Sequence, residues 1–262
     1  MKTVILCGGR GTRIREANES LPKPMLPIGG RPILWHIMHR YALYGFDEFV
    51  LCLGYKGWLI KEFFLNYLTM TRDVTVKLGE PGKARHHSVL TKGEDWTVTL
   101  AETGETANTG GRILAIRDYV QDDDLFLLTY GDGLGNVDLK ALVAFHRQHG
   151  RIATLTTVHP PGRFGELVLD DGRVTEFNEK PQASAGFING GYFVLDAKRI
   201  WKYLTPDSPN LVWEEGPLRA LAADGELFAF EHVGFWQPMD TPREYELLNR
   251  MWESGKAPWD RV

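Results

Sequence analysis

The feature that most constrains the fold is a short apolar run followed at once by a glycine-rich loop, residues 3 to 13 (TVILCGGRGTR). Its first five residues are apolar or β-branched, which is typical of a buried strand in a parallel sheet. Gly8, Gly9 and Gly11 let the backbone turn sharply and approach a ligand, so that several N–H groups can point at one anion. Such a loop predicts a phosphate site at the carboxyl edge of an α/β sheet, with a tight turn that binds nothing as the alternative.

The residues around this loop supply further donors. Thr12 offers a hydroxyl, and Arg13 offers a planar fork of N–H groups that suits a phosphate. The loop is not a P-loop, because it has no lysine, and Ile14 stands where a dinucleotide fingerprint needs its third glycine. The next cation is Lys23, which lies between two prolines that stiffen the backbone. Lys23 is therefore a candidate ligand of a triphosphate.

Two motifs together carry a family resemblance, GGRGTR at 8 to 13 and PKPMLPIGGRPIL at 22 to 34. They resemble the signature of the sugar-1-phosphate nucleotidylyltransferases, which join a nucleoside triphosphate to a sugar 1-phosphate and release pyrophosphate. The resemblance implies an α/β fold with a mixed, mostly parallel Rossmann-like sheet flanked by helices, of the nucleotide-diphospho-sugar transferase type. The nucleotide-binding residues that it implies in this part of the chain are Leu6, Gly8, Gly9, Gly11, Thr12, Arg13 and Lys23.

Strand and helix patterns alternate along the first part of the chain. The periodicity predicts a helix over residues 32 to 44, a strand over 48 to 53 and a second helix over 57 to 68. This alternation implies a parallel sheet with right-handed crossovers. We expect residues 1–262 to form a single catalytic domain, with a nucleotide-binding half at about 1–135 and a sugar-binding half at about 136–262.

Composition argues against several classes of partner. The net charge of −4 provides no general field for nucleic acid. No apolar run is long enough to span a bilayer, and the chain begins directly with a strand instead of an apolar leader, so we expect no association with a membrane.

Cys7 and Cys52 both lie in predicted buried strands, which favours two free thiols in a core over a disulfide or a metal site. A cytoplasmic enzyme is expected.

A second glycine pair precedes a predicted helix in residues 107 to 120. Thr109 and Gly110 could let the backbone lie close to a flat ring, and Arg112 could reach a phosphate or a base edge. The alternative is an ordinary helix start with Thr109 as its cap. In the family this segment borders the nucleotide base, and its TGGR form resembles the cytidylyltransferases for glucose 1-phosphate more than the thymidylyl or uridylyl branches.

Two aspartates are candidate magnesium ligands. Asp132 follows an apolar predicted strand and lies between two glycines, which leaves room for Mg²⁺ against phosphate oxygens. A turn aspartate is the alternative for this residue. Asp240 precedes a Thr-Pro pair at the start of a predicted helix, where it could serve as the N-cap. By resemblance, Asp240 is the second Mg²⁺ ligand.

A sugar cradle is predicted in the second half of the chain. A hairpin over residues 166 to 177 leads to Glu179 and Lys180, and a glycine-interrupted strand over 186 to 195 contains Asn189. We expect the carboxylate of Glu179 and the amide of Asn189 to contact hydroxyls of the sugar, and Lys180 to contact its phosphate. The alternative for Glu179 and Lys180 is an ion pair on the surface. The sugar-phosphate-binding residues that the resemblance implies are Tyr130, Gly165, Glu179, Lys180 and Asn189.

The reaction that the resemblance implies joins CTP and α-D-glucose 1-phosphate to give CDP-glucose and pyrophosphate. The sugar phosphate attacks the α-phosphorus in line and, being an anion, needs no general base. The protein therefore has to hold two anions together and neutralise their charge. Mg²⁺ is the expected cofactor, and family analogy implies a homo-oligomer, in particular a hexamer. The catalytic residues implied are Arg13, Lys23, Asp132, Lys180 and Asp240.

Three alternatives stay open from the sequence. One is the same chemistry with UTP, dTTP or another sugar 1-phosphate. Another is a metal-dependent glycosyltransferase, which would normally carry two aspartates at one strand end, whereas Asp132 is followed by Gly133 and Leu134. The last is a catalytically silent nucleotide-sensing subunit, which should lack some of the five catalytic residues that are all present here.

Overall fold

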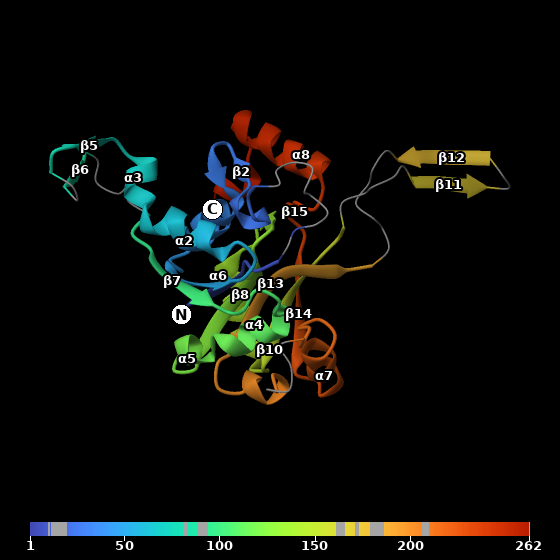
Figure 1. Cartoon of the computed structure of the whole chain (residues 1–262). Coiled ribbons are helices and arrows are strands. Elements are labelled where there is room, and N and C mark those ends of the chain that lie inside the picture. The colour runs from blue at the N-terminus through green and yellow to red at the C-terminus, as the bar shows by residue number, and fades with distance from the viewer. Residues whose placement is uncertain are drawn as a thin grey trace.

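A seven-stranded sheet forms the centre of the computed structural model (Figure 1). The structure describes residues 1–9, 11, 20–80, 83–87, 94–160, 166–170, 173–178, 186–205 and 210–261, the two short ranges 166–170 and 173–178 by their backbone alone. The strands of the sheet, in their spatial order, are β14 (Leu227–His232), β10 (Ala153–Val158), β13 (Ile188–Asp196), β8 (Leu125–Tyr130), β1 (Thr3–Leu6), β4 (Glu48–Leu53) and β7 (Thr97–Glu102).

The direction of the strands confirms the mixed, mostly parallel sheet. Strand β1 pairs in parallel with both β4 and β8, and β4 pairs in parallel with β7. Strand β13 runs antiparallel to both of its neighbours, β8 and β10, whereas β10 and β14 are parallel. Strands from both halves of the chain thus belong to one sheet.

Helices cover both faces of this sheet (Figure 1). Along β1, Ile5 packs on one face with apolar residues of the long helices, while Val4 and Leu6 pack on the other. This burial on both sides explains why β1 is a continuous apolar run. The helices described are α1 (Ile33–Ala42), α2 (Gly57–Leu65), α3 (Tyr67–Thr71), α4 (Thr109–Ala115), α5 (Arg117–Val120), α6 (Leu139–His149), α7 (Pro217–Ala223) and α8 (Pro242–Glu253), with short 3₁₀ turns at Lys23–Met25, Ile200–Tyr203 and Pro258–Asp260.

Two of the predicted helices are each divided into two. The helix expected over 57 to 68 is broken at Asn66 into α2 and α3, and the one expected after the glycine pair within 107 to 120 is broken at Ile116 into α4 and α5. Both break residues have a φ near −100°, outside the helical range.

Within the described part of the chain, none of the helices has both the length and the apolar character needed to cross a membrane.

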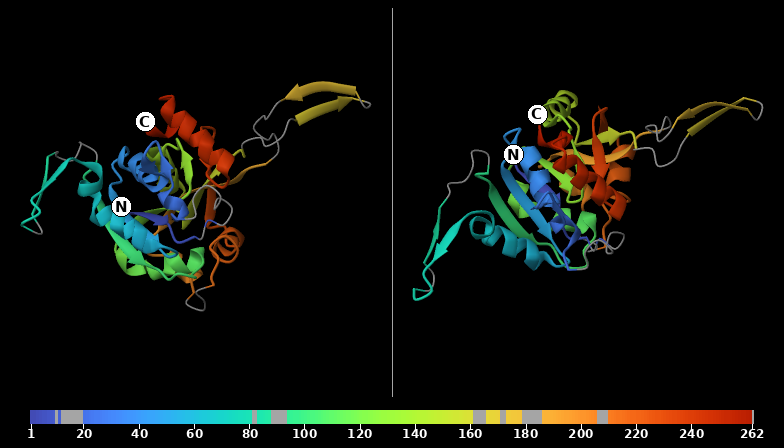
Figure 2. Two further views of the ribbon diagram at one scale, coloured as in Figure 1. Left: turned by 45° about the horizontal axis from the view of Figure 1, so that its top comes forward. Right: turned by 90° about the horizontal axis from the view of Figure 1, so that it is seen from above.

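Two hairpins project from the body on opposite sides (Figure 2). One consists of β5 (Val74–Val76) and β6 (Ala84–His86), and the other consists of β11 (Glu166–Asp170) and β12 (Arg173–Asn178). The second hairpin was expected from the sequence and is confirmed. Two further two-stranded pairs lie closer to the sheet, β2 (Pro27–Ile28) with β3 (Arg31–Pro32), and β9 (Gly133–Gly135) with β15 (Trp236–Pro238).

Candidate active site

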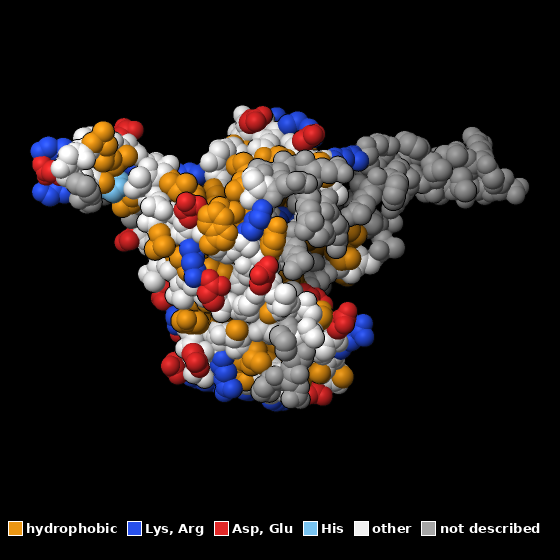
Figure 3. Space-filling model, in the orientation of Figure 1, with side chains coloured by type: hydrophobic (Ala, Val, Ile, Leu, Met, Phe, Trp, Pro, Cys, Tyr) orange, Lys and Arg blue, Asp and Glu red, His pale blue; other side chains and the backbone are white. Residues whose placement is uncertain are grey.

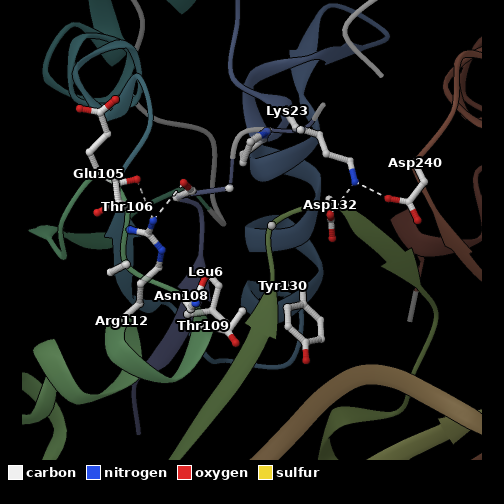
Figure 4. Close-up of a pocket in the computed structure, with 16 residues that line it drawn as sticks. Leu6, Lys23, Glu105, Thr106, Asn108, Thr109, Arg112, Tyr130, Asp132 and Asp240 are labelled. Carbon is white, nitrogen blue, oxygen red and sulfur yellow. Dashed lines mark hydrogen bonds and ion pairs between the residues drawn. The ribbon is translucent and has the colours of Figure 1, made fainter. Parts of the chain in front are cut away.

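A cleft of about 550 Å³ lies at the carboxyl ends of β1 and β8 (Figure 4). Its volume is within the range of small-molecule sites, and its position is the usual one for a ligand in an open α/β sheet. Ten of the predicted site residues line it, namely Leu6, Gly8, Gly9, Gly11, Lys23, Thr109, Arg112, Tyr130, Asp132 and Asp240. The remaining lining residues are Pro24, Glu105, Thr106, Ala107, Asn108 and Gly131.

The loop after β1 is held close to its neighbouring strands. The Cys7 amide donates to the carbonyl of Cys52 at 3.0 Å, and the Gly131 amide donates to the carbonyl of Leu6 at 3.1 Å. A Cβ at Gly131 would approach that carbonyl to 2.9 Å, so a larger residue would push the loop away from β8. Both cysteines are free and buried, as predicted, and burial raises the pKa of each thiol.

Lys23 lies at one end of the cleft, between Pro22 and Pro24, where it begins the 3₁₀ turn Lys23–Met25, and it is only 9% exposed. Its ammonium nitrogen lies 2.6 Å from Oδ2 of Asp132 and 2.6 Å from Oδ1 of Asp240 (Figure 4). Burial opposes the charge on Lys23, but the two carboxylates outweigh it and raise the pKa of this lysine above its usual value. The lysine held between prolines is therefore a fixed, charged group.

Pairing of β9 with β15 brings the two aspartates together. Gly133 lies opposite Pro238, and the amide of Met239 donates to the carbonyl of Asp132 at 2.8 Å. The alternative that Asp240 caps the following helix is wrong. Thr241 is the N-cap of α8, and Glu244 completes its capping box, which leaves the carboxylate of Asp240 facing Lys23.

The guanidinium of Arg112 is bound to the protein backbone. One terminal nitrogen donates to the carbonyls of Leu53 and Gly104 at 2.9 and 2.8 Å, and the other donates to the carbonyl of Gly8 at 3.1 Å. Burial lowers the pKa of Arg112 from its usual value. A Cβ at Gly8 would lie 2.1 Å from the Arg112 Cζ. Arg112 thus lines the cleft and also holds together the three segments that contain Gly8, Leu53 and Gly104.

The start of α4 is the second wall of the cleft. Asn108 is the N-cap residue, so the alternative in which Thr109 caps the helix is wrong. The Thr109 hydroxyl instead donates to Oε2 of Glu214 at 2.7 Å. Gly110 does not line the cleft: its amide donates to the Leu211 carbonyl at 2.9 Å, and a Cβ there would lie 2.8 Å from that oxygen.

On the predicted sugar side, the Tyr130 hydroxyl donates to Oε1 of Glu214 at 2.5 Å. Nδ2 of Asn189 lies 3.4 Å from the same hydroxyl, and Oδ1 of Asn189 accepts from the Gly191 amide at 2.8 Å. Gly191 has a φ of +80°, and a Cβ there would meet the Tyr130 ring at 2.7 Å. Five predicted site residues lie outside the described part of the chain, namely Thr12, Arg13, Gly165, Glu179 and Lys180.

The segment 105 to 108 and Glu214 were not predicted from the sequence as parts of the site. The segment is a short polar stretch after β7 that contains no motif, although Gly104 beside it has a φ of +96° and marks a sharp turn. Glu214 lies 105 positions from Thr109 and 84 from Tyr130, so no local pattern places it there. Only the folded chain brings it against Thr109 and Tyr130, which line the cleft.

Asp132 and Asp240 provide a donor set that suits Mg²⁺. Both carboxylates already face one cation, the Lys23 ammonium, and both are partly exposed to the cleft. Within the residues that the structure describes, no cluster of three or more His, Cys, Asp or Glu side chains could hold a metal. One or two carboxylates, completed by phosphate oxygens and water, are the usual protein contribution to a nucleotide-bound Mg²⁺.

The chain belongs to the nucleotidyl transferase family, whose model matches residues 2–241. It is 50% identical over 259 residues to the glucose-1-phosphate cytidylyltransferase of Salmonella typhi, across 99% of this chain and 98% of that protein. It is 30% identical to the mannose-1-phosphate guanylyltransferase 1 of Arabidopsis thaliana, across 94% of this chain and 63% of that protein. Enzymes of this family act on a nucleoside triphosphate and a sugar phosphate and generally use a divalent metal.

A solved structure supports the same fold. The HddC protein of Yersinia pseudotuberculosis superimposes with a TM-score of 0.64 over 96% of this chain and 99% of that one, at 22% identity. At this identity the likeness extends to the architecture alone. The predicted fold class is thereby confirmed.

Proposed function

We propose that this chain transfers a cytidylyl group from CTP to α-D-glucose 1-phosphate, giving CDP-glucose and pyrophosphate. The observation that carries the proposal is the 50% identity, over almost the whole of both chains, to a glucose-1-phosphate cytidylyltransferase. The cleft supports it, since a buried lysine that can contact a triphosphate and two carboxylates that can hold its metal ion meet at the end of a glycine loop.

The mechanism follows from charge. The phosphate of the sugar is already an anion, so the protein has to bring it in line with the α-phosphorus and offset the charge that accumulates. Lys23 lines the cleft, and its ammonium would contact the triphosphate. Arg13 would contact the same triphosphate, and Lys180 would contact the phosphate of the sugar.

Asp132 and Asp240 would hold Mg²⁺ between them. When bound, the metal would supply positive charge that offsets the charge of the reacting phosphates. The base would lie against the loop after β1 and the start of α4, and the glucose ring would lie toward Tyr130, Asn189, Gly165 and Glu179. Apart from Tyr130, which belongs to the first half, this arrangement would place the nucleotide in the half at about 1–135 and the sugar in the half at about 136–262.

Pyrophosphate release tests the reaction and the base together. The purified protein is given Mg²⁺, glucose 1-phosphate and, in separate reactions, CTP, UTP, dTTP, ATP or GTP. We expect release with CTP alone. Release with UTP or dTTP instead would keep the family reaction and contradict the cytidylyl assignment, and no release with any of them would contradict the catalytic assignment.

Asp132→Asn tests the metal site at the level of one residue. The amide keeps the shape of the side chain but removes its charge, so turnover is expected to fall by about 100-fold or more without loss of fold. Asp122→Asn is the matched control, because Asp122 lies on the exposed surface. Near-normal turnover of the Asp132 variant would contradict the assigned role.

We also propose a cytoplasmic homo-oligomer, in particular a hexamer. Helix α3, strand β5 and the turn after β5 leave large apolar side chains in solvent, with Met70, Val76 and Leu78 exposed by 60%, 55% and 91%. Apolar side chains are visible on this projecting part of the molecule in Figure 3. Apolar surface of this kind favours contact with another chain. Light scattering after size exclusion should give six times the 29.7 kDa mass, and Leu78→Lys should lower it. A monomeric mass for the unaltered protein would exclude the assembly.

A further inference from the structure

Glu214 links the two walls of the cleft, although its place in the chain gives no sign of it. Its carboxylate accepts from Thr109, at the start of α4, and from Tyr130, at the end of β8. Both of these partners line the cleft. Glu214 itself is only partly exposed and does not line the cleft, so any effect on a ligand has to pass through the two hydroxyls.

A carboxylate fixes the direction of these hydrogen bonds, because it has lone pairs but no proton to give. The hydroxyl of Thr109 donates to Glu214 and in turn accepts from the Trp213 amide at 2.9 Å. The hydroxyl of Tyr130 has one proton, and it donates the hydrogen bond made with that proton to Glu214 at 2.5 Å. Toward any other group, the Tyr130 hydroxyl can only accept a hydrogen bond.

The opposite polarity is fixed at Asn189. Its Oδ1 accepts from the Gly191 amide at 2.8 Å, so the amide group cannot be turned round without losing this bond. The Nδ2 group therefore faces Tyr130, at 3.4 Å from its hydroxyl. An amide nitrogen has two protons, and among the described residues Tyr130 is its one acceptor. Asn189 thus presents a donor beside the acceptor of Tyr130.

We propose that Glu214 is a positioning residue that sets the hydrogen-bond polarity of the sugar subsite, so that Asn189 donates and Tyr130 accepts. The group that satisfies both is a hydroxyl, because it accepts one hydrogen bond and donates another. A carbonyl, an ether or a fluorine has no proton for Tyr130, and a deoxy carbon satisfies neither partner. This inference rests on the proposed function and adds the basis on which the site selects a hydroxylated sugar.

The test compares hydroxyl with fluorine, since fluorine accepts weakly but never donates. Glucose 1-phosphate and its 2-, 3-, 4- and 6-deoxyfluoro analogues are used with saturating CTP and Mg²⁺, and kcat/KM is measured for each. In the unaltered enzyme, one position should prefer hydroxyl over fluorine by tenfold or more, the range seen when a buried polar group loses its partner. If the preference for hydroxyl over fluorine were less than tenfold at all four positions, the inference would be overturned.

Glu214→Ala frees the proton of Tyr130, which can then be donated to the ligand. The preference for hydroxyl over fluorine at that position should fall by about tenfold, with the KM of the sugar phosphate raised and that of CTP changed by less than about threefold. Glu215→Ala is the matched control, because this neighbour is exposed and should keep the preference. Equal losses for glucose 1-phosphate and every analogue would indicate a merely structural role and overturn the inference.

Tyr130→Phe keeps the inference testable if Glu214→Ala does not fold. This variant removes the acceptor itself, so it should lose the same preference, and the double variant should behave like Tyr130→Phe alone. An unchanged preference in Tyr130→Phe would overturn the inference. These results are distinct from a failure of the proposed function, in which the unaltered enzyme would not turn over glucose 1-phosphate at all.

Discussion

The ammonium nitrogen of Lys23 lies 2.6 Å from Oδ2 of Asp132. With Asp240 at the same distance on its other side, the lysine stands between the two carboxylates assigned to the metal. A divalent cation and the ammonium therefore compete for the same negative charge. A triphosphate changes this competition, because it offers the ammonium a new anionic partner.

Lys23→Met should bind free Mn²⁺ at least about tenfold more tightly than the unaltered protein in the absence of nucleotide. Without the ammonium, the two carboxylates repel each other, and a cation relieves this repulsion. The free Mn²⁺ signal in electron paramagnetic resonance gives the dissociation constant directly. Lys140→Met is the control, because Lys140 is an exposed residue of α6. Unchanged Mn²⁺ binding by Lys23→Met would contradict the competition.

Adjacent residues at the start of α8 should separate stability from catalysis. Thr241→Ala removes the side-chain cap and should lower the free energy of unfolding by about 1 kcal/mol with turnover nearly intact. Asp240→Asn leaves the cap in place and should lower turnover by about 100-fold. Urea unfolding and pyrophosphate release measure the two effects. If Asp240→Asn were the less stable of the two and kept its turnover, the assignment of the cap and the ligand would be reversed.

Arg112→Met should lower the free energy of unfolding by about 3 kcal/mol. The guanidinium donates to carbonyls of Gly8, Leu53 and Gly104, and buried acceptors that lose a charged donor are costly. Arg147→Met is the control, since Arg147 is exposed and should change stability by less than about 0.5 kcal/mol. Equal stability of the two variants in urea would show that these hydrogen bonds of Arg112 contribute nothing to the fold.

Acid should destabilise the protein partly through His36. This side chain is fully buried, its Nε2 donates to the Ile28 carbonyl and its Nδ1 accepts from the Trp259 indole. Burial lowers the pKa of His36 from 6.5 to about 4. Above pH 6.5 neither the folded nor the unfolded chain is protonated here. Between pH 6.5 and 4 only the unfolded chain takes up the proton, so stability falls as pH falls, by up to about 3 kcal/mol from this group.

Urea unfolding of His36→Gln across this pH range measures that contribution. The variant should lose less stability than the unaltered protein between pH 7 and pH 4.5, because glutamine does not titrate. His87→Gln serves as the control, since His87 is exposed and should leave the slope unchanged. An identical slope in His36→Gln would mean that this histidine is not the group responsible.

Features that depend on neighbours in the chain were predictable from the sequence. The apolar run of β1 and its glycines indicated a buried strand and a phosphate loop, and the prolines around Lys23 indicated a held lysine. The hairpin of β11 and β12 was equally local. These features follow from the backbone preferences of a few consecutive residues, so the sequence of one segment is enough to predict them.

Features that depend on distant contacts were not predictable. The sequence identified Arg112 as a cation but could not show that backbone carbonyls receive its hydrogen bonds. Asp240 and Thr241 are both residues that cap helices, and only the pairing of β15 with β9 decides between them. Glu214 carried no signal at all, because its partners lie about a hundred positions away.

Lys23 and Asp240 are 217 positions apart, and this separation has a consequence for synthesis of the chain. A protein emerges from the ribosome N-terminus first, and contacts of high sequence separation form late. The lysine, the glycine loop and Asp132 are all made long before Asp240 exists. A chain terminated prematurely after β13 would therefore contain the centre of the sheet but only one of the two carboxylates that balance Lys23.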